Sequence, residues 1–175
     1  MTKPTQEKKE DIFATHILAP FHKAHDNIIT NCRKTFDIQE RTNSFNVKSV
    51  CAVIEGVTNQ AYKDSLYTLP EVQENLLAVL KKSKPSDIEA MAIFISNIGT
   101  ILKQMCVDTK YLGVSNVEKH DEHGAFNRKA VDDIMRRGAG EAKNEAVQSL
   151  SGYIDSIGAT GEVKTKNSPT PKSSR

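Results

Sequence analysis

The chain has 175 residues, 38% of them apolar and 26% charged, with a formal net charge of +2. This length suits a single domain with a buried core. The first residues lack the apolar stretch of a secretory signal, and the longest wholly apolar run, 90–95, is far shorter than the roughly 20 residues of a membrane-spanning helix. We therefore expect a soluble protein, cytoplasmic by default and without a transmembrane segment, while secretion without a cleaved signal peptide stays open.

The positive charge is concentrated at the carboxyl terminus. Residues 159–175 contain four basic residues and one acidic residue, so this segment carries +3 and the rest of the chain −1. A slightly acidic body makes nucleic acid an unlikely partner, because duplex binding needs a basic face. The Ser, Thr, Pro and Lys of 159–175 predict a disordered basic tail, which serves solubility alone or contacts a partner. With a flexible segment at 1–8, this tail would flank a helical bundle domain at 9–158.

The amino-terminal half predicts two helical regions. Apolar residues at helical spacing run through 9–36, and Pro20 should divide this region because proline lacks an amide hydrogen and clashes with the preceding turn. The polar stretch 37–44 indicates a connection. The next helix carries apolar residues at alternating spacings of three and four, which favour a helix although several of these residues are β-branched. These residues are Val47, Val50, Ile54, Val57 and Ala61.

The strongest pattern lies in the middle of the chain. An apolar stripe at spacings of three and four lasts for about five helical turns. It consists of Ile88, Met91, Ile95, Ile98, Leu102 and Met105. The stripe predicts a long helix, covered by other helices, with those at 47–61 and 147–157 as expected neighbours. A shorter helix is expected before it, and the polar segment 108–126, which contains two glycines, indicates a long loop that could carry function.

The last helical region should be interrupted. Helical spacing resumes at Asn127, but the segment 138–140 has the sequence Gly-Ala-Gly, and each glycine costs about 1 kcal/mol relative to alanine inside a helix. A kink or break is therefore expected there, and Gly158 is placed to end the final helix. Five or six helices with short connections predict an all-α fold, a five- to six-helix bundle with a disordered carboxyl-terminal tail.

Two histidine pairs give the sharpest chemical hypothesis. The pairs His22-x-x-His25 and His120-x-x-His123 each place two imidazoles on one side of a helical turn, with carboxylates beside them. Zinc or non-haem iron accepts such nitrogen and oxygen ligands. The simpler interpretation is that these histidines are solvated or hydrogen-bonded. The leading expectation is therefore no cofactor, with Zn or Fe as the alternative.

Two arginines suggest an anion site. Arg136 and Arg137 precede the Gly-Ala-Gly segment, where free amide groups and guanidinium groups would both favour phosphate. The segment lacks the preceding strand of a dinucleotide fold and the Gly-Lys-Ser/Thr of a P-loop. A flexible helix junction with solvated charges is the simpler interpretation.

No set of catalytic residues is apparent. The three cysteines lie within or beside apolar stretches, which favours buried free thiols over nucleophiles, and they are Cys32, Cys51 and Cys106. The leading expectation is a non-enzymatic helical protein that acts through protein–protein interaction or assembly, with a protein partner or by self-association. Two alternatives stay open: a metal-binding helical protein that uses the two His-x-x-His pairs, and a bacterial protein exported through a signal in its carboxyl-terminal tail.

Overall fold

The computed structural model describes residues 13–80 and 85–155, and every regular element in these ranges is a helix. The elements are one π-helical turn, η1 (Phe13–Ile17), and the α-helices α2 (Ala19–Arg41), α3 (Val47–Leu66), α4 (Leu69–Leu80), α5 (Pro85–Glu122) and α6 (Arg128–Asp155). The predicted all-α bundle is confirmed. The predicted flexible segment 1–8, Gly158 and the predicted disordered tail 159–175 lie outside the described residues.

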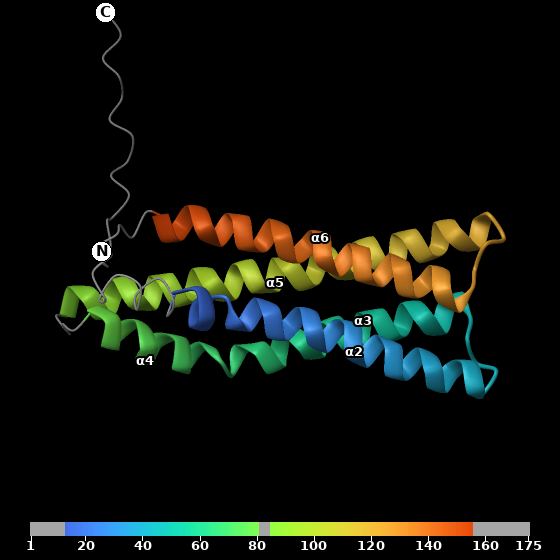
Figure 1. The fold of residues 1–175 in the computed structure, drawn as a ribbon, viewed down its shortest axis with the longest axis horizontal. Helices are drawn as coiled ribbons and strands as arrows, with labels where there is room; N and C mark the ends of the chain where they lie inside the picture. The colour runs from blue at the N-terminus through green and yellow to red at the C-terminus, as the bar shows by residue number, and fades with distance from the viewer. Residues whose placement is uncertain (1–12, 81–84, 156–175) are drawn as a thin grey trace, which may run out of the picture.

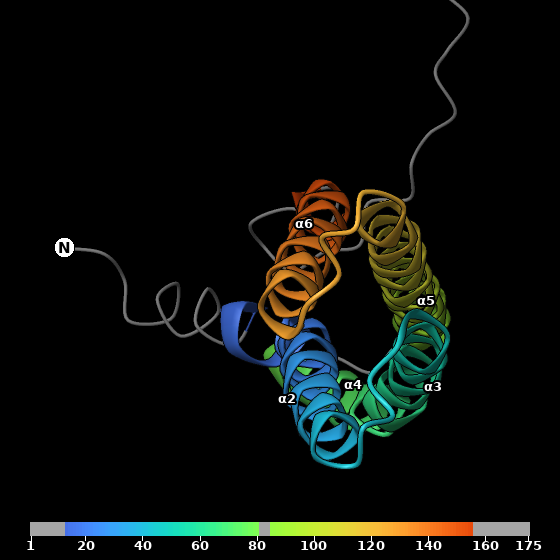
Figure 2. The same cartoon turned by 90° about the vertical axis from the view of Figure 1, so that its right-hand side faces the viewer.

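Helices α2, α3, α5 and α6 form an antiparallel up-and-down bundle (Figure 1). Viewed along its length, the bundle is a ring in which α2 and α5 each lie between α3 and α6 (Figure 2). Helix α4 extends the line of α3 and contacts α5 and η1. The connections 42–46 and 123–127 lie together at one end of the bundle. We call this end the loop end.

The predicted break at Pro20 is confirmed, because η1 ends before α2 and this proline lies in the first turn of α2, where its missing amide hydrogen costs nothing.

The connection predicted over 37–44 is wrong, because α2 continues to Arg41. Asp37 accepts a hydrogen bond from Arg128 of α6 at 2.5 Å, and Glu40 Oε2 lies 3.9 Å from Arg128 Nε. Residues 37–41 thus belong to α2 and pair with α6, and the connection is confined to 42–46.

The apolar stripe of α5 forms the centre of the core. The stripe residues Met91, Ile98, Leu102 and Met105 are buried, Ile95 is half-buried, and Ile88 is exposed. Both neighbours expected for the stripe, α3 and the carboxyl-terminal helix α6, contact α5. The alternating spacing of three and four therefore identifies a true core helix.

The long loop predicted over 108–126 is wrong. Helix α5 continues to Glu122, and only residues 123–127 connect it to α6. One side of this segment is buried, at Thr109 and Val117. Its charged residues lie on the other sides, which explains its polar composition. The Thr109 hydroxyl is satisfied inside the helix, since it donates to the carbonyl oxygen one turn earlier at 2.8 Å.

The two glycines of this segment have different roles. Gly113 is a packing contact inside α5, because a Cβ atom at this position would lie 2.8 Å from Met135 Sδ of α6 and 3.2 Å from Ile54 Cγ2 of α3. Gly124 has a φ of +66° just beyond the helix, a conformation that glycine adopts at little cost. Only the second glycine therefore ends α5.

Of the kink or break predicted at 138–140, the break is wrong, because α6 runs without interruption from Arg128 to Asp155, while the kink stays a prediction. Gly138 is buried against α5, and a Cβ atom added to it would lie 3.4 Å from Leu112 Cβ. The close approach of the two helices thus offsets the low helix propensity of this glycine. A Cβ at Gly140 would meet nothing within 4 Å.

One helix among the described residues, α5 from Ile88 to Glu122, is long and apolar enough to cross a membrane, with an 18-residue window of mean hydropathy 1.4. The core helix of a globular bundle meets the same criterion. In this bundle the buried side of α5 is covered by α3 and α6. The expected absence of a transmembrane segment stays a prediction.

Ile98→Ala should lower the free energy of unfolding by about 2–5 kcal/mol, because it leaves a cavity at a side chain that is 0% exposed. Ile93→Ala, on the same helix at a position that is 55% exposed, should change it little. Urea denaturation of the full chain measures both. If Ile98→Ala leaves folding intact and only abolishes self-association, the stripe is an interface rather than core.

Gly113→Val should lower the free energy of unfolding by about 1–3 kcal/mol, because the new side chain would overlap Met135 and Ile54. Gly56→Val in α3 is the matched control, since a Cβ atom there meets nothing within 4 Å. The control should be neutral or slightly stabilising, because valine has a better helix propensity than glycine. Thermal melting compares the two, and equal effects would contradict the close packing at Gly113.

Candidate functional site

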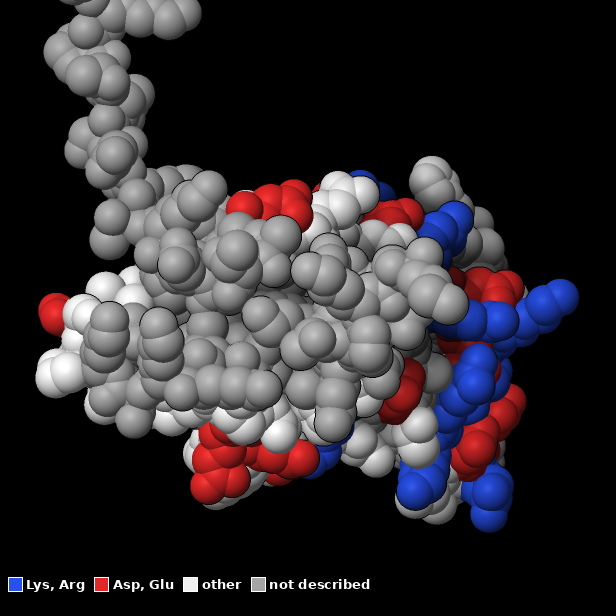
Figure 3. Space-filling view, turned by 60° about the vertical axis from the view of Figure 1, so that its left-hand side comes forward, with Lys and Arg blue, Asp and Glu red and all other residues white. Residues whose placement is uncertain are grey.

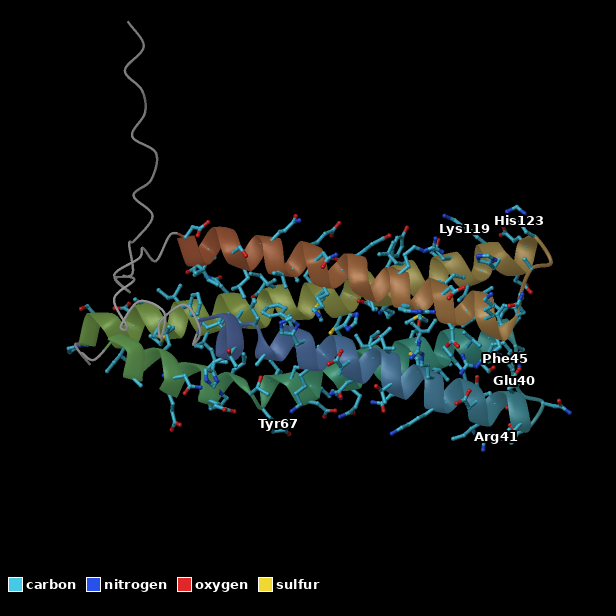
Figure 4. The ribbon with its side chains drawn as sticks, viewed as in Figure 1. Glu40, Arg41, Phe45, Tyr67, Lys119 and His123 are labelled. Carbon is cyan, nitrogen blue, oxygen red and sulfur yellow. The ribbon has the colours of Figure 1, made fainter. Side chains whose placement is uncertain are left out.

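The loop end of the bundle is closed by an aromatic and ionic cluster. Phe45 stacks on Phe126 at 5.1 Å between ring centroids and meets Phe36 edge-on at 6.0 Å. The Arg128 guanidinium lies 5.4 Å from the Phe36 ring centroid and pairs with Asp132 on its own helix. The cluster joins α2, α6 and both connections, so it holds this end of the bundle in place. Phe45 and Glu40 lie at this end in Figure 4.

Burial alone would lower the pKa of the Arg128 guanidinium. Its hydrogen bonds to Asp37 and Asp132, together with their charges, outweigh burial and raise the pKa. The guanidinium is thus charged and held between carboxylates of α2 and α6, which makes it a structural residue rather than a ligand-binding one.

A charged pocket lies between α5 and α6 near the loop end, with a cavity volume of about 470 Å³. We call it the α5/α6 pocket, and it is lined by Asn116, Lys119, His120 and His123 together with Arg137 and Glu141. The first four follow one side of the last turns of α5 and the segment just after it, and the last two are one turn apart on α6. Figure 4 shows Lys119 and His123 at this end of α5.

The pocket brings together two groups that the sequence predicted separately. The pair His120 and His123 was a candidate metal site, and Arg136 and Arg137 were candidate anion ligands. Arg137 lines the pocket with both histidines, whereas Arg136 points elsewhere and pairs with Asp133 at 2.8 Å. The backbone amides expected to help bind an anion lie within the continuous helix α6, so only side chains serve the site.

The other histidine pair lies apart from this pocket. His22 and His25 lie in the first two turns of α2, whereas the loop end lies beyond the last turn of this helix. His25 Nδ1 lies 3.2 Å from Asp26 Oδ1. Among the described residues, no three His, Cys, Asp or Glu side chains are grouped so that they could hold a metal ion. The two pairs therefore do not converge on one centre.

An apolar groove lies on another side of α5, between α5 and α3, with a cavity volume of about 570 Å³. We call it the α3/α5 groove, and it is lined by Glu55 of α3 and by Val107, Lys110, Tyr111, Val114, Ser115 and Glu118 of α5. Tyr111 is 71% exposed and Val107 is 42% exposed. These two side chains lie one helical turn apart, so they form a continuous apolar surface in the groove.

The rim of the groove is predominantly acidic. In the described part of the chain, Glu55, Lys110 and Glu118 form no ion pair. Burial, and then the charges of Glu118 and Glu55, raise the pKa of the half-buried Cys51 thiol. The groove thus offers an apolar centre between unpaired charges.

The cysteines are free, as expected, and two of them are fully buried. Burial raises the pKa of the Cys32 and Cys106 thiols to about 12. Because the thiolate is the nucleophilic form, none of the three described thiols is activated.

Among the coloured residues of Figure 3, Lys and Arg side chains are mixed with Asp and Glu rather than forming an unbroken basic surface.

Sequence reasoning missed the groove and found only parts of the pocket. A helical reading of 108–126 would have aligned Val107, Tyr111 and Val114 at spacings of four and three. The sequence did indicate the pair His120 and His123, but the loop expected over 108–126 concealed both the groove and the place of this pair beside α6.

No protein-family model matches this chain, and no curated protein or solved structure gives a match. The functional conclusions therefore rest on the α3/α5 groove and the α5/α6 pocket.

The stability of the protein should fall as the pH is lowered through the histidine range. Partial desolvation, and then the charge of Lys143, lowers the pKa of the exposed His22 imidazole, while Asp26 opposes this shift and His25 adds to it. The unfolded chain then binds a proton more readily than the folded one. The His22 contribution to unfolding free energy should therefore begin to decline below about pH 6.5 and continue to decline until the lower folded-state pKa is passed.

His22→Gln should reduce the loss of unfolding free energy between about pH 7.5 and about pH 5.5. His123→Gln, an exposed histidine at the other end of the bundle, is the control. Urea denaturation at a series of pH values measures the effect. A pH dependence that is unchanged in His22→Gln would contradict the assignment.

Proposed function

We propose that this protein is a non-enzymatic interaction protein whose partner docks in the α3/α5 groove. The observation that carries the proposal is the exposure of Tyr111 and Val107 side by side in a groove between two rigid helices. Large apolar side chains that adjoin one another on a surface are typical of binding sites, whereas isolated ones are ordinary. Tyrosine is also among the residues that contribute most to binding energy at protein interfaces.

The groove has the layout of a small interface. Val107, Tyr111 and Val114 supply apolar surface, and burying it would contribute about 25 cal/mol for each Å² removed from water. Glu55 and Glu118 stand at the rim without a charged partner in the described residues. A partner that supplies an apolar anchor and a basic residue beside it would complement both features.

The chemistry of the described residues supports a binding role over catalysis. The thiols of Cys32 and Cys106 are buried and have raised pKa values, and that of Cys51 is raised as well. Metal binding through the two His-x-x-His pairs stays a prediction that needs further ligands. Export through a carboxyl-terminal signal also stays a prediction, since that segment lies outside the described residues.

Tyr111→Ser should weaken partner binding by about tenfold or more, because it removes the most exposed apolar side chain of the groove. Tyr67→Ser is the matched control, since Tyr67 is 82% exposed at the α3–α4 junction and points away from the bundle in Figure 4. Both variants should fold normally because both side chains are exposed.

The measurement is comparative affinity capture with the full chain, followed by titration of the captured protein against purified variants. Sedimentation of the purified chain tests self-association in parallel. The proposal predicts a partner, or a dimer, that is retained by Tyr67→Ser and lost in Tyr111→Ser. Equal weakening by both variants, or a monomer for which no bound protein depends on Tyr111, would contradict it.

A further inference from the structure

We propose that the α5/α6 pocket binds a phosphate group, carried by a small phosphate monoester or present as the free ion. The pocket combines side chains from two helices that the sequence leaves well apart, namely Lys119, His120 and His123 at the end of α5 and Arg137 on α6. Its volume of about 470 Å³ falls within the ~300–1,000 Å³ common for small-molecule sites. This site is separate from the α3/α5 groove and does not depend on the proposed docking function.

The cations of the pocket are available to a ligand. Neither Lys119 nor Arg137 forms an ion pair within the described part of the chain. The neighbouring arginines are engaged, because Arg128 pairs with Asp37 and Asp132, and Arg136 pairs with Asp133. Arg137 is therefore distinguished from its neighbours by its free guanidinium as well as by its place in the pocket.

The donors in the pocket suit phosphate oxygens. A guanidinium group binds phosphate through two parallel hydrogen bonds, and the lysine ammonium adds a point charge. The imidazole groups of His120 and His123 and the amide of Asn116 each supply further N–H donors. Six polar or charged side chains thus line an open pocket whose lining surface is mostly polar, which favours a small, charged ligand over an apolar one.

Helix-end electrostatics explains only part of this arrangement. Lys119 and His120 lie in the last turn of α5, where positive charge stabilises the helix dipole without any ligand. The helix dipole does not explain the position of Arg137, which lies in the interior of α6 and lines the same pocket. The convergence across two helices is what points to a ligand.

Glu141 defines the ligand further. Its carboxylate lines the pocket one turn beyond Arg137, without an ion pair in the described residues. A carboxylate repels phosphate oxygens but accepts hydrogen bonds from hydroxyl groups. A phosphate monoester with a hydroxyl group would place its phosphate near Lys119 and Arg137 and its hydroxyl near Glu141. This arrangement makes a hydroxylated ester a better ligand than the free ion.

The test is an amide NMR titration of the full chain with inorganic phosphate and with glycerol 3-phosphate at constant ionic strength. Both ligands should shift the signals of the pocket residues. Arg137→Gln should weaken binding by about tenfold, as expected for the loss of a charge-assisted hydrogen-bond pair. Arg136→Gln is the matched control, because it removes the same charge one residue away, and it should change the affinity by less than about twofold.

The two probes distinguish the source of the phosphate. Tighter binding of glycerol 3-phosphate, lost in Glu141→Gln, assigns the pocket to an ester, and equal affinities assign it to the free ion. The proposal is overturned if neither ligand shifts the pocket signals, or if Arg136→Gln and Arg137→Gln weaken binding equally. A parallel titration with Zn²⁺ that shifts only His120 and His123, with no response to phosphate, would assign the pocket to a cation instead.

Discussion

The packing of α5 against its neighbours is the constraint on which the rest of the structure depends. Its buried positions extend from Met91 to Val117, so the helix cannot end early without exposing core residues. Gly113 permits this packing, because it lets Met135 of α6 and Ile54 of α3 reach the helix backbone. The intrinsic cost of a glycine in a helix is about 1 kcal/mol, and the close packing that its missing side chain allows offsets that cost.

Both candidate sites follow from this continuity. Because α5 remains helical beyond Met105, the side chains that follow it are placed at regular angles around one axis. One side presents Val107 and Tyr111 beside α3, and another presents His120 and His123 beside α6. A loop over the same residues would have given neither the apolar surface nor the charged pocket a defined geometry. The geometry of both candidate surfaces is thus a consequence of core packing.

The sequence predicts the fold class and the core of the bundle well, because the spacing of apolar residues reports directly on which side of a helix is buried. The stripe from Ile88 to Met105 is confirmed except at Ile88, which is exposed, and the break at Pro20 is confirmed as well. Residues whose role depends on contacts with distant parts of the chain could not be assigned from the spacing of apolar residues. Gly113 and Gly138 suggest breaks when viewed locally, and only the helices packed against them reveal that they are contacts. Asp37 likewise looks like part of a connection until Arg128 is placed beside it.

Only some residues of the α5/α6 pocket could be predicted from the sequence, because the others come from a distant part of the chain. The His-x-x-His spacing shows that two imidazoles share one side of a helix, but it does not show what faces them. The antiparallel contact of α5 with α6 supplies Arg137 and Glu141, and the guanidinium of Arg137 is the reason for proposing an anion rather than the metal ion of the alternative hypothesis. The groove and the pocket then lie on different sides of one uninterrupted helix. Coupling between two sites requires an element with two arrangements, whereas α5 is one continuous helix packed against α3 and α6. We therefore expect the proposed phosphate ligand and the proposed docking partner to bind additively.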